Sequence, residues 1–258
     1  MVDWTETLGD AGAAADAGPL QARANPLYLQ VGQLLVGRIA SGMWKPGELI
    51  PSEVNLAREL GVSQGTVRKA VMALEARHLV LRYRGRGTYV AQHTSRRALF
   101  HFFRLFDADG RRPSPTSLVL SHRVLLATAA ERRDLALPEG ARVHAILRLR
   151  RLDGTPAILE RVTVAHAAMP DLHLPLGHEM PDELYVLYQT RHGITIAQAR
   201  ERLTAVAASA TDAKHLGVRP GEPLLQIVRT ALDVEGRPVE LRCSRCITSR
   251  WHYAADLI

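Results

Sequence analysis

Residues 52–74, SEVNLARELGVSQGTVRKAVMAL, contain two short apolar patterns at helical spacing. Ser52 and Ser63 stand immediately before the two patterns, and serine is a preferred residue at a helix N-cap. Gly61 ends the first pattern early, so that only Gly61-Val62-Ser63 joins the two helices. The spacing therefore predicts a helix-turn-helix, whose second helix buries Val67, Ala70, Val71 and Leu74.

Polar and basic residues occupy the other face of the second helix. Gln64, Arg68 and Lys69 lie there near its N-terminal end, with Thr66 beside them. A recognition helix contacts base edges with its early residues, and glutamine and arginine can bond bidentately to adenine and guanine. The same pattern also fits an ordinary solvated helix face, so by itself it leaves DNA binding open.

A hairpin is predicted directly after the helix-turn-helix. Leu79–Tyr83 and Thr88–Val90 have the composition of strands, and Arg84-Gly85-Arg86-Gly87 joins them. Glycines allow close approach of the backbone, and arginine side chains suit phosphates or a minor groove. A plain hairpin turn is the alternative, but it does not explain a tip of alternating arginine and glycine. We therefore predict a DNA-binding wing.

Composition divides the chain into three parts. Residues 1–25 are rich in Ala, Gly and Asp and lack periodicity, which predicts a disordered tail. Residues 26–93 form the winged helix-turn-helix domain, which begins with a helix through Leu27 and Ile39 that ends at Gly42. Residues 94–258 alternate strand-like and short helical patterns, which predicts an α+β domain. Because a DNA-binding head with so long a further part is rarely only a DNA-binding protein, we expect this domain to bind an effector and to form the dimer.

Length, composition and charge exclude several classes of protein. With 258 residues, 47% hydrophobic and 23% charged, the chain can bury a sizeable core. It contains neither an apolar run of about 18 residues nor a signal peptide, and two cysteines do not make a disulfide scaffold. The net charge of +7 favours a polyanionic partner, although 30 of the 33 basic residues are Arg, which also reflects genomic base composition. These features predict a cytoplasmic, nucleoid-associated protein with no membrane partner.

Several motifs in residues 26–91 together resemble the winged-helix head of the GntR transcriptional regulators. They are Ser41–Gly47 (SGMWKPG), Pro51-Ser52-Glu53, Leu56-Ala57, Gly61-Val62-Ser63, Thr66-Val67-Arg68 and Gly85–Val90 (GRGTYV). Val54 and Gln64 stand where this family often has arginine, which predicts a different operator. The DNA-contacting positions expected from the patterns and the resemblance are Ser52, Glu53, Ser63, Gln64, Thr66, Arg68, Lys69, Arg84, Gly85, Arg86 and Gly87.

One head presents a single recognition helix and covers only a few base pairs. Tight and specific binding of double-stranded DNA therefore needs two heads related by two-fold symmetry. We predict a homodimer joined through residues 98–258 that binds an inverted repeat.

The C-terminal part resembles the UTRA ligand-sensing domain of the histidine-utilisation-repressor branch. The resemblance covers roughly residues 98–254 and implies a chorismate-lyase-like antiparallel sheet, with short helices expected on one face. It rests on Arg148-Leu149-Arg150 with Asp153-Gly154, Leu159-Glu160, Leu184-Tyr185, Ala213–Val218, Pro223-Leu224-Leu225 and Gly236–Glu240.

A candidate effector site follows from this resemblance and from strand geometry. Arg148 and Arg150 are two residues apart and so share one face of a strand, where two guanidinium groups can hold a carboxylate or a phosphate. Glu160, Tyr185 and Glu240 match family positions that bind polar or aromatic parts of an effector.

The nature of the effector is less constrained. Glu183 stands where phosphosugar-binding members tend to have serine, and Cys246 replaces a tyrosine. Both departures favour a carboxylate metabolite over a phosphosugar. The alternative is that Arg148 and Arg150 form ordinary cross-strand ion pairs.

Other chemistry finds little support. Cys243 and Cys246 are three residues apart and would face opposite sides of a strand, so we predict no metal site. No catalytic or cofactor-binding motif occurs. We therefore predict a ligand-responsive repressor that is not an enzyme and needs no cofactor. An enzyme with a chorismate-lyase-like domain and an effector-independent DNA-binding protein are the alternatives.

Overall fold

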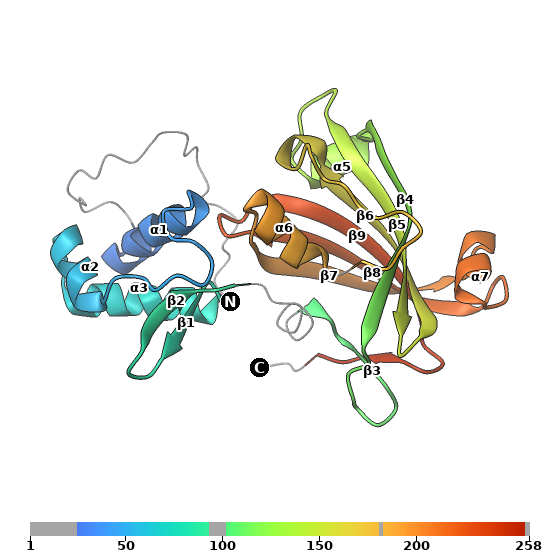
Figure 1. Cartoon of the computed structure of the whole chain (residues 1–258), viewed down its shortest axis with the longest axis horizontal. Coiled ribbons are helices and arrows are strands. Elements are labelled where there is room, and N and C mark those ends of the chain that lie inside the picture. Colours follow the sequence, from blue (N-terminus) through green and yellow to red (C-terminus); the bar gives the residue numbers. More distant parts are fainter. Residues whose placement is uncertain (1–24, 93–101, 181–182, 256–258) are drawn as a thin grey trace.

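The computed structural model describes residues 25–92, 102–180 and 183–255, which form a helical head and a larger α+β body (Figure 1). The predicted disordered tail and the boundary near residues 93–94 lie outside this part of the chain. The head contains α1 (Leu27–Ala40), α2 (Glu53–Leu60), α3 (Gln64–Ala76), β1 (Val80–Tyr83) and β2 (Gly87–Val90).

Local signals set the ends of the head helices as predicted. The hydroxyl groups of Ser52 and Ser63 accept hydrogen bonds from the backbone N–H of Asn55 and Thr66, so both serines cap their helices. Gly61 ends α2 with φ of 64°, a left-handed conformation that glycine adopts without a Cβ penalty. The apolar stripes of α1, α2 and α3 then meet in one core, which includes Val31, Leu35, Leu56, Val67, Val71 and Leu74.

A six-stranded antiparallel sheet forms the centre of the body, in the order β4-β5-β6-β9-β8-β7. Its strands are β4 (Pro115–Leu126), β5 (Arg142–Leu152), β6 (Thr155–Ala165), β7 (Ile196–Ala207), β8 (Pro223–Asp233) and β9 (Pro238–Ile247). A separate pair, β3 (Leu105–Phe106) and β10 (His252–Tyr253), lies beside it. No strand was predicted over 196–207, where β7 forms an edge of the sheet.

Helices cover both faces of this sheet, which corrects the expectation that they cover only one. On one face, α6 (Leu184–His192) buries Tyr185 and Tyr188 against Ile146 and Val162. On the other, α7 (Ala210–Leu216) packs through Leu216, and α5 (Ala129–Asp134) lies next to Leu135 and Val143. The central strands β5 and β6 are buried on both faces, and strands that are buried on both faces need cover on both.

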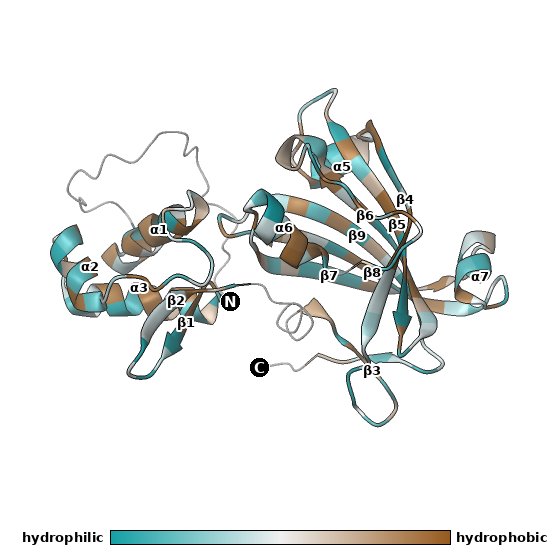
Figure 2. Cartoon of the chain, in the orientation of Figure 1, coloured by the Kyte–Doolittle hydropathy of each residue, from teal (hydrophilic) through white to brown (hydrophobic). Residues whose placement is uncertain are grey.

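The face under α6 is apolar at both ends and charged in the middle. One apolar cluster contains Ile146, Val162 and Tyr188, and another contains Leu152, Ile158 and Trp251. Between them, Arg148 and Glu160 are buried on the same face, and Arg242 is buried beside them, opposite Val162. Figure 2 shows hydrophilic and hydrophobic residues alternating along the strands of the sheet. Within the described residues, no helix is long and apolar enough to cross a membrane.

Candidate DNA-binding surface and effector site

The exposed face of α3 carries the side chains predicted to meet DNA. Gln64, Arg68 and Lys69 are exposed, and Thr66 is half-buried. Arg68 donates from Nε to Oε2 of Glu53 at 3.1 Å, and Glu53 also accepts a hydrogen bond from Arg82 at 2.7 Å. Ser52, Ser63 and Glu53 thus have structural bonds within the head, as caps and as an ion-pair centre, and their contact with DNA remains a prediction.

The predicted wing is a two-stranded hairpin with a basic tip. β1 and β2 are antiparallel, with Val80 opposite Val90 at one end and Tyr83 opposite Gly87 at the other. Leu49 adds an isolated bridge to Tyr89. Arg84, Gly85 and Arg86 are exposed at the turn. Gly87 has φ of 100°, a conformation that strains any side-chain-bearing residue, and a Cβ there would lie 2.6 Å from a methyl carbon of Leu49, which would have to move.

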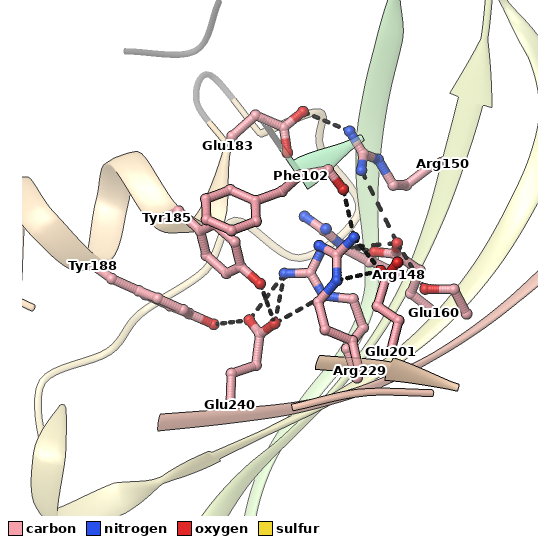
Figure 3. Close-up of polar contacts among 12 residues, drawn as sticks. Phe102, Arg148, Arg150, Glu160, Glu183, Tyr185, Tyr188, Glu201, Arg229 and Glu240 are labelled. Carbon is pink, nitrogen blue, oxygen red and sulfur yellow. Dashed lines mark hydrogen bonds and ion pairs between the residues drawn. The ribbon is translucent and has the colours of Figure 1, made fainter. Parts of the chain in front are cut away.

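In the body, four arginines meet four glutamates on the sheet face beneath α6 (Figure 3). They are Arg148, Arg150, Arg229 and Arg242, with Glu160, Glu183, Glu201 and Glu240. All five residues predicted for the effector site (Arg148, Arg150, Glu160, Tyr185 and Glu240) are buried in or beside this group, which we call the charge cluster. Equal numbers of the two charges make the cluster neutral without a ligand.

Arg148 is fully buried but only partly satisfied. Its Nε donates to Oε2 of Glu160 at 2.5 Å, across directly paired positions of β5 and β6. Its two terminal amino groups, Nη1 and Nη2, have no hydrogen-bond partner among the described residues. Because an unpaired buried donor costs about 1–3 kcal/mol, this end of Arg148 is where an acceptor group from outside the protein would be most stabilising.

Glu160 collects positive charge from three sides. Burial alone would raise the pKa of its carboxyl, but Arg148, Arg242 and Arg150 outweigh burial and lower that pKa below its usual range. Ser244 donates a further hydrogen bond to Oε1 at 3.1 Å. Glu160 is therefore ionised at neutral pH and anchors the arginines around it.

Arg150 forms an ion pair with Glu183, a residue that stood out in the sequence only because related proteins tend to have serine there. Its Nη2 donates to Glu183 at 2.6 Å, and its guanidinium lies 5.1 Å from the ring centre of Phe103. Glu183 is the N-cap of α6 but does not cap that helix with its side chain. Nε of Arg150 has no hydrogen-bond partner within the part of the chain that the structure describes. The alternative of ordinary cross-strand pairs thus fits the Arg148–Glu160 bond but not the unpaired nitrogens.

Glu240 organises the other half of the cluster. Tyr185 and Tyr188 donate to its carboxylate at 3.1 and 2.8 Å (Figure 3). Arg242, two residues further along β9, donates to both oxygens at 2.9 Å. Burial, followed by the charge of Glu240, raises the pKa of both tyrosines, so their hydroxyl groups stay protonated as donors.

Sequence reasoning missed several members of the cluster. Arg242 follows Glu240 by two residues and Tyr188 follows Tyr185 by three, so strand and helix spacing could have placed both. Arg229 and Glu201 pair through Nη2 and Oε1 at 2.5 Å between β8 and β7. No local pattern could reveal that pair, because β7 itself was not predicted.

The cluster is nearly closed in this state. Its cavity, lined by Phe102, Arg150 and Tyr185 among others, has a volume of about 20 Å³, room for about one water molecule. A larger cavity of about 500 Å³ lies between the end of α3 and β7. Within the described residues no group of side chains could hold a metal ion. Cys243 and Cys246 are free thiols on opposite faces of the sheet.

Two family models match the chain. The model described as "Bacterial regulatory proteins, gntR family" matches residues 27–90. The model described as "UTRA domain" matches residues 110–252, more than half of the chain.

Named relatives align with most of the chain. The regulator SmoD of Agrobacterium fabrum is 29% identical over 84% of this chain and 89% of its own. A probable fructoselysine utilization operon transcriptional repressor of Escherichia coli is 28% identical over 87% and 91%. The regulator GgaR of Escherichia coli is 28% identical over 92% and 93%. These relatives carry the names of regulators and not of enzymes.

Solved structures share the fold. The ligand-binding domain of a putative GntR-family regulator from Bordetella bronchiseptica is 31% identical, with a TM-score of 0.58, and the match covers 61% of this chain and 98% of that one. PhnF from Mycobacterium smegmatis matches 90% of this chain and 99% of its own with a TM-score of 0.53 at 22% identity, a likeness in fold alone.

Proposed function

The chain belongs to the gntR family of bacterial regulatory proteins and carries a UTRA domain, and from this premise we propose that it is a repressor that a small anionic metabolite releases from a palindromic operator. It is a transcriptional regulator of this type and not an enzyme. The name of the Escherichia coli relative, a probable repressor of fructoselysine utilization, supports repression as the mode of action.

The head supports operator binding. Gln64, Arg68 and Lys69 on α3 and Arg84 and Arg86 of the wing are all exposed, as expected for a helix in the major groove with a wing on the backbone or minor groove. The body serves as the dimer element, because two heads are needed to cover an inverted repeat. Operator binding would keep the protein in the cytoplasm, on the nucleoid.

The unpaired terminal amino groups of buried Arg148 carry the effector proposal. A carboxylate presents two acceptor oxygens in the geometry of these two donors. Glu160 and Glu240 would accept hydrogen bonds from effector hydroxyl or ammonium groups, and Tyr185 would pack beside them. Arg150 would join once the effector competes with Glu183. A carboxylate fits better than a phosphosugar, because a dianionic phosphate would lie against the carboxylate of Glu183.

DNA selection tests the regulatory half of this proposal. The full-length protein would be used to select duplexes from random sequence, and sedimentation would give the mass of the free and bound protein. We expect a dimer and an inverted repeat with half-sites about 34–36 Å apart or a multiple of that. A monomer with full affinity for one half-site would contradict it.

A thermal-shift screen tests the effector half, since a ligand that binds only the native state raises its apparent stability. Carboxylate metabolites, neutral sugars and phosphosugars would be compared on the wild type and on Arg148→Met. We expect carboxylates to stabilise the wild type and to lose this effect in the variant. A hit that stabilises both equally would place the ligand elsewhere.

A further inference from the structure

The turn between β8 and β9 contacts the head. Val234 is 5% exposed and belongs to the apolar core of the head, together with residues of α1 and α3. Its carbonyl oxygen accepts a hydrogen bond from Nη2 of Arg77 at 3.1 Å. Arg77 is the C-cap residue of α3, the recognition helix. Figure 1 shows this turn as the part of the large sheet that extends toward the head.

This turn is held rigidly by the residue that precedes it. Oδ1 of Asp233 accepts backbone hydrogen bonds from Glu235 and Arg237, each at 2.9 Å. Oδ2 accepts a third from Nε of Arg237, also at 2.9 Å. A turn pinned by three bonds to one carboxylate moves together with the strands it joins, because bending it would break those bonds.

The same two strands form a wall of the charge cluster. Arg229 lies on β8 five residues before Val234, and Glu240 and Arg242 lie on β9 a few residues after the turn. At about 3.3 Å per residue, the cluster and the head contact are roughly 17 Å apart along one hairpin. A shift of these strands at the cluster is therefore a shift of the turn at the head.

Arg229 also lines both cavities. It borders the small cavity of the charge cluster and the cavity of about 500 Å³ at the end of α3, which Arg77 lines as well. Its guanidinium pairs with Glu201, and Glu201 in turn accepts a hydrogen bond from Tyr253 at 2.5 Å. Arg229 thus borders both the proposed effector site and the junction of the two domains.

Arg77 holds the junction through a directional hydrogen bond and not through an ion pair. No carboxylate of the described residues forms an ion pair with it, and burial lowers its pKa. Its bond to a single carbonyl group requires one orientation of α3 relative to the turn. This contact is sensitive to small displacements in a way that a diffuse charge attraction is not.

We propose that the β8–β9 hairpin transmits the state of the charge cluster to the recognition helix, and that Arg77 is the positioning residue at which the head receives it. The proposal rests on the proposed function and adds its route of regulation. Rearrangement of Arg229, Glu240 and Arg242 moves the hairpin, the turn displaces Arg77, and the spacing of two heads on an operator changes. The size of the response is limited by the difference in free energy of the two states, as in any allosteric coupling.

A double-mutant cycle tests this route with the full-length chain and a duplex selected by that chain. Glu240→Gln keeps the shape of the side chain but removes the charge that holds Arg242, and so perturbs the cluster without a ligand. We expect it to change the Kd for the duplex at least about fivefold, the lower end of usual coupling. In an Arg77→Ala background we expect the same substitution to change Kd less than about twofold.

Two further variants separate positioning from simple stability. Arg77→Lys keeps a long side chain with a donor and is expected to restore most of the response to Glu240→Gln. Arg219→Ala removes an arginine that is 93% exposed in the loop before β8, and is expected to leave the response unchanged. Tyr185→Phe, which deletes one hydroxyl bonded to Glu240, replaces Glu240→Gln if that variant does not fold. Equal changes of Kd with and without Arg77, or no change from the cluster variant, would overturn the proposal.

Hydrogen exchange separates this proposal from the proposed function. The amides of His78 and Leu79, bonded to Glu75 and Leu74 at the end of α3, can be followed without DNA. We expect their exchange to be faster in Glu240→Gln than in the wild type, and to be unaffected by Glu240→Gln once Arg77 is alanine. If no duplex is selected, the proposed function fails while the exchange data still decide the coupling; unchanged exchange in Glu240→Gln would refute the route.

Discussion

Glu53 and Arg68 form an ion pair across the helix-turn-helix, with 3.1 Å between Oε2 and Nε. The side chain of Glu53 is 14% exposed and that of Arg68 is 57% exposed. Arg82 on β1 holds the second oxygen of Glu53 at 2.7 Å. A carboxylate fixed from the wing side thus orients the arginine through Nε, and the outer end of that arginine is available to a base edge.

Replacing Arg68 should weaken operator binding and relax its specificity. We expect Arg68→Ala to cost about 1–3 kcal/mol if Arg68 binds a guanine, with discrimination lost at one base pair. Glu53→Gln should cost less, because it releases Arg68 without removing it. Competition binding with duplexes changed at single positions measures both effects. Arg219→Ala serves as the control, and wild-type affinity in Arg68→Ala would refute the role of Arg68.

The wing arginines should act on the DNA backbone more evenly. Arg84→Ala and Arg86→Ala are expected to weaken binding to all duplexes by similar factors. If each arginine neutralises one phosphate, each variant should reduce the slope of log K against log salt by about 0.9. Binding titrations between low and moderate salt give these slopes. Unchanged slopes would mean that the wing does not contact phosphates.

Glu183 should decide whether the site accepts a free phosphate. In Glu183→Gln the guanidinium of Arg150 loses its carboxylate partner at 2.6 Å, and an anion can take that place. We expect inorganic phosphate to raise the melting temperature of this variant and to have little effect on the wild type. In the double variant Glu183→Gln/Arg150→Gln, phosphate should no longer raise the melting temperature.

The matched control for this prediction is Glu179→Gln. Glu179 is 54% exposed and lies 3.7 Å from Arg151, so its removal changes the net charge equally but outside the cluster. A phosphate response of the same size in Glu179→Gln and Glu183→Gln would mean that surface charge, and not the freed Arg150, is responsible.

Stability should fall in mild acid because of a row of histidines. His144 is 1% exposed, bonds to His122 at 2.8 Å, and lies 3.1 Å from His166. Burial lowers the pKa of His122 and His144 below 6.5. The unfolded chain binds protons near pH 6.5 while the folded chain does not, so stability is full above that pH and is lost as the pH falls below it.

Thermal unfolding between pH 7.5 and about pH 5 would measure this loss. His144→Gln should flatten the dependence of melting temperature on pH, whatever its effect at neutral pH. His178→Gln, at an exposed histidine, should leave the dependence as in the wild type. Identical pH profiles for wild type and His144→Gln would assign the acid sensitivity to other groups.

Local signals predicted most of the head and much of the sheet. Ser52, Ser63 and Gly61 act within one turn of their own helices, so their roles could be recognised without knowing the rest of the chain. The Asp153-Gly154 and Glu235-Gly236 turns, each with a positive φ at its glycine, and the alternating burial along part of β5 likewise depend on neighbouring residues. β7 escaped prediction because its exposed edge position leaves it little apolar alternation.

The sequence by itself determined the helices and wing of the head, where those helices end, and that Arg148 and Arg150 share one face of a strand. Dihedral preferences, capping and a side-chain period of two act over a few residues, so these features can be recognised locally. Only the tertiary structure decided that Glu183 forms an ion pair with Arg150, that two nitrogens of Arg148 lack partners among the described residues, and that Val234 bonds to Arg77. These pairings join residues far apart in the chain. Which partner each charged side chain contacts depends on how strands and helices pack, because in the buried interior, away from water, electrostatic interactions between neighbouring charges are strong.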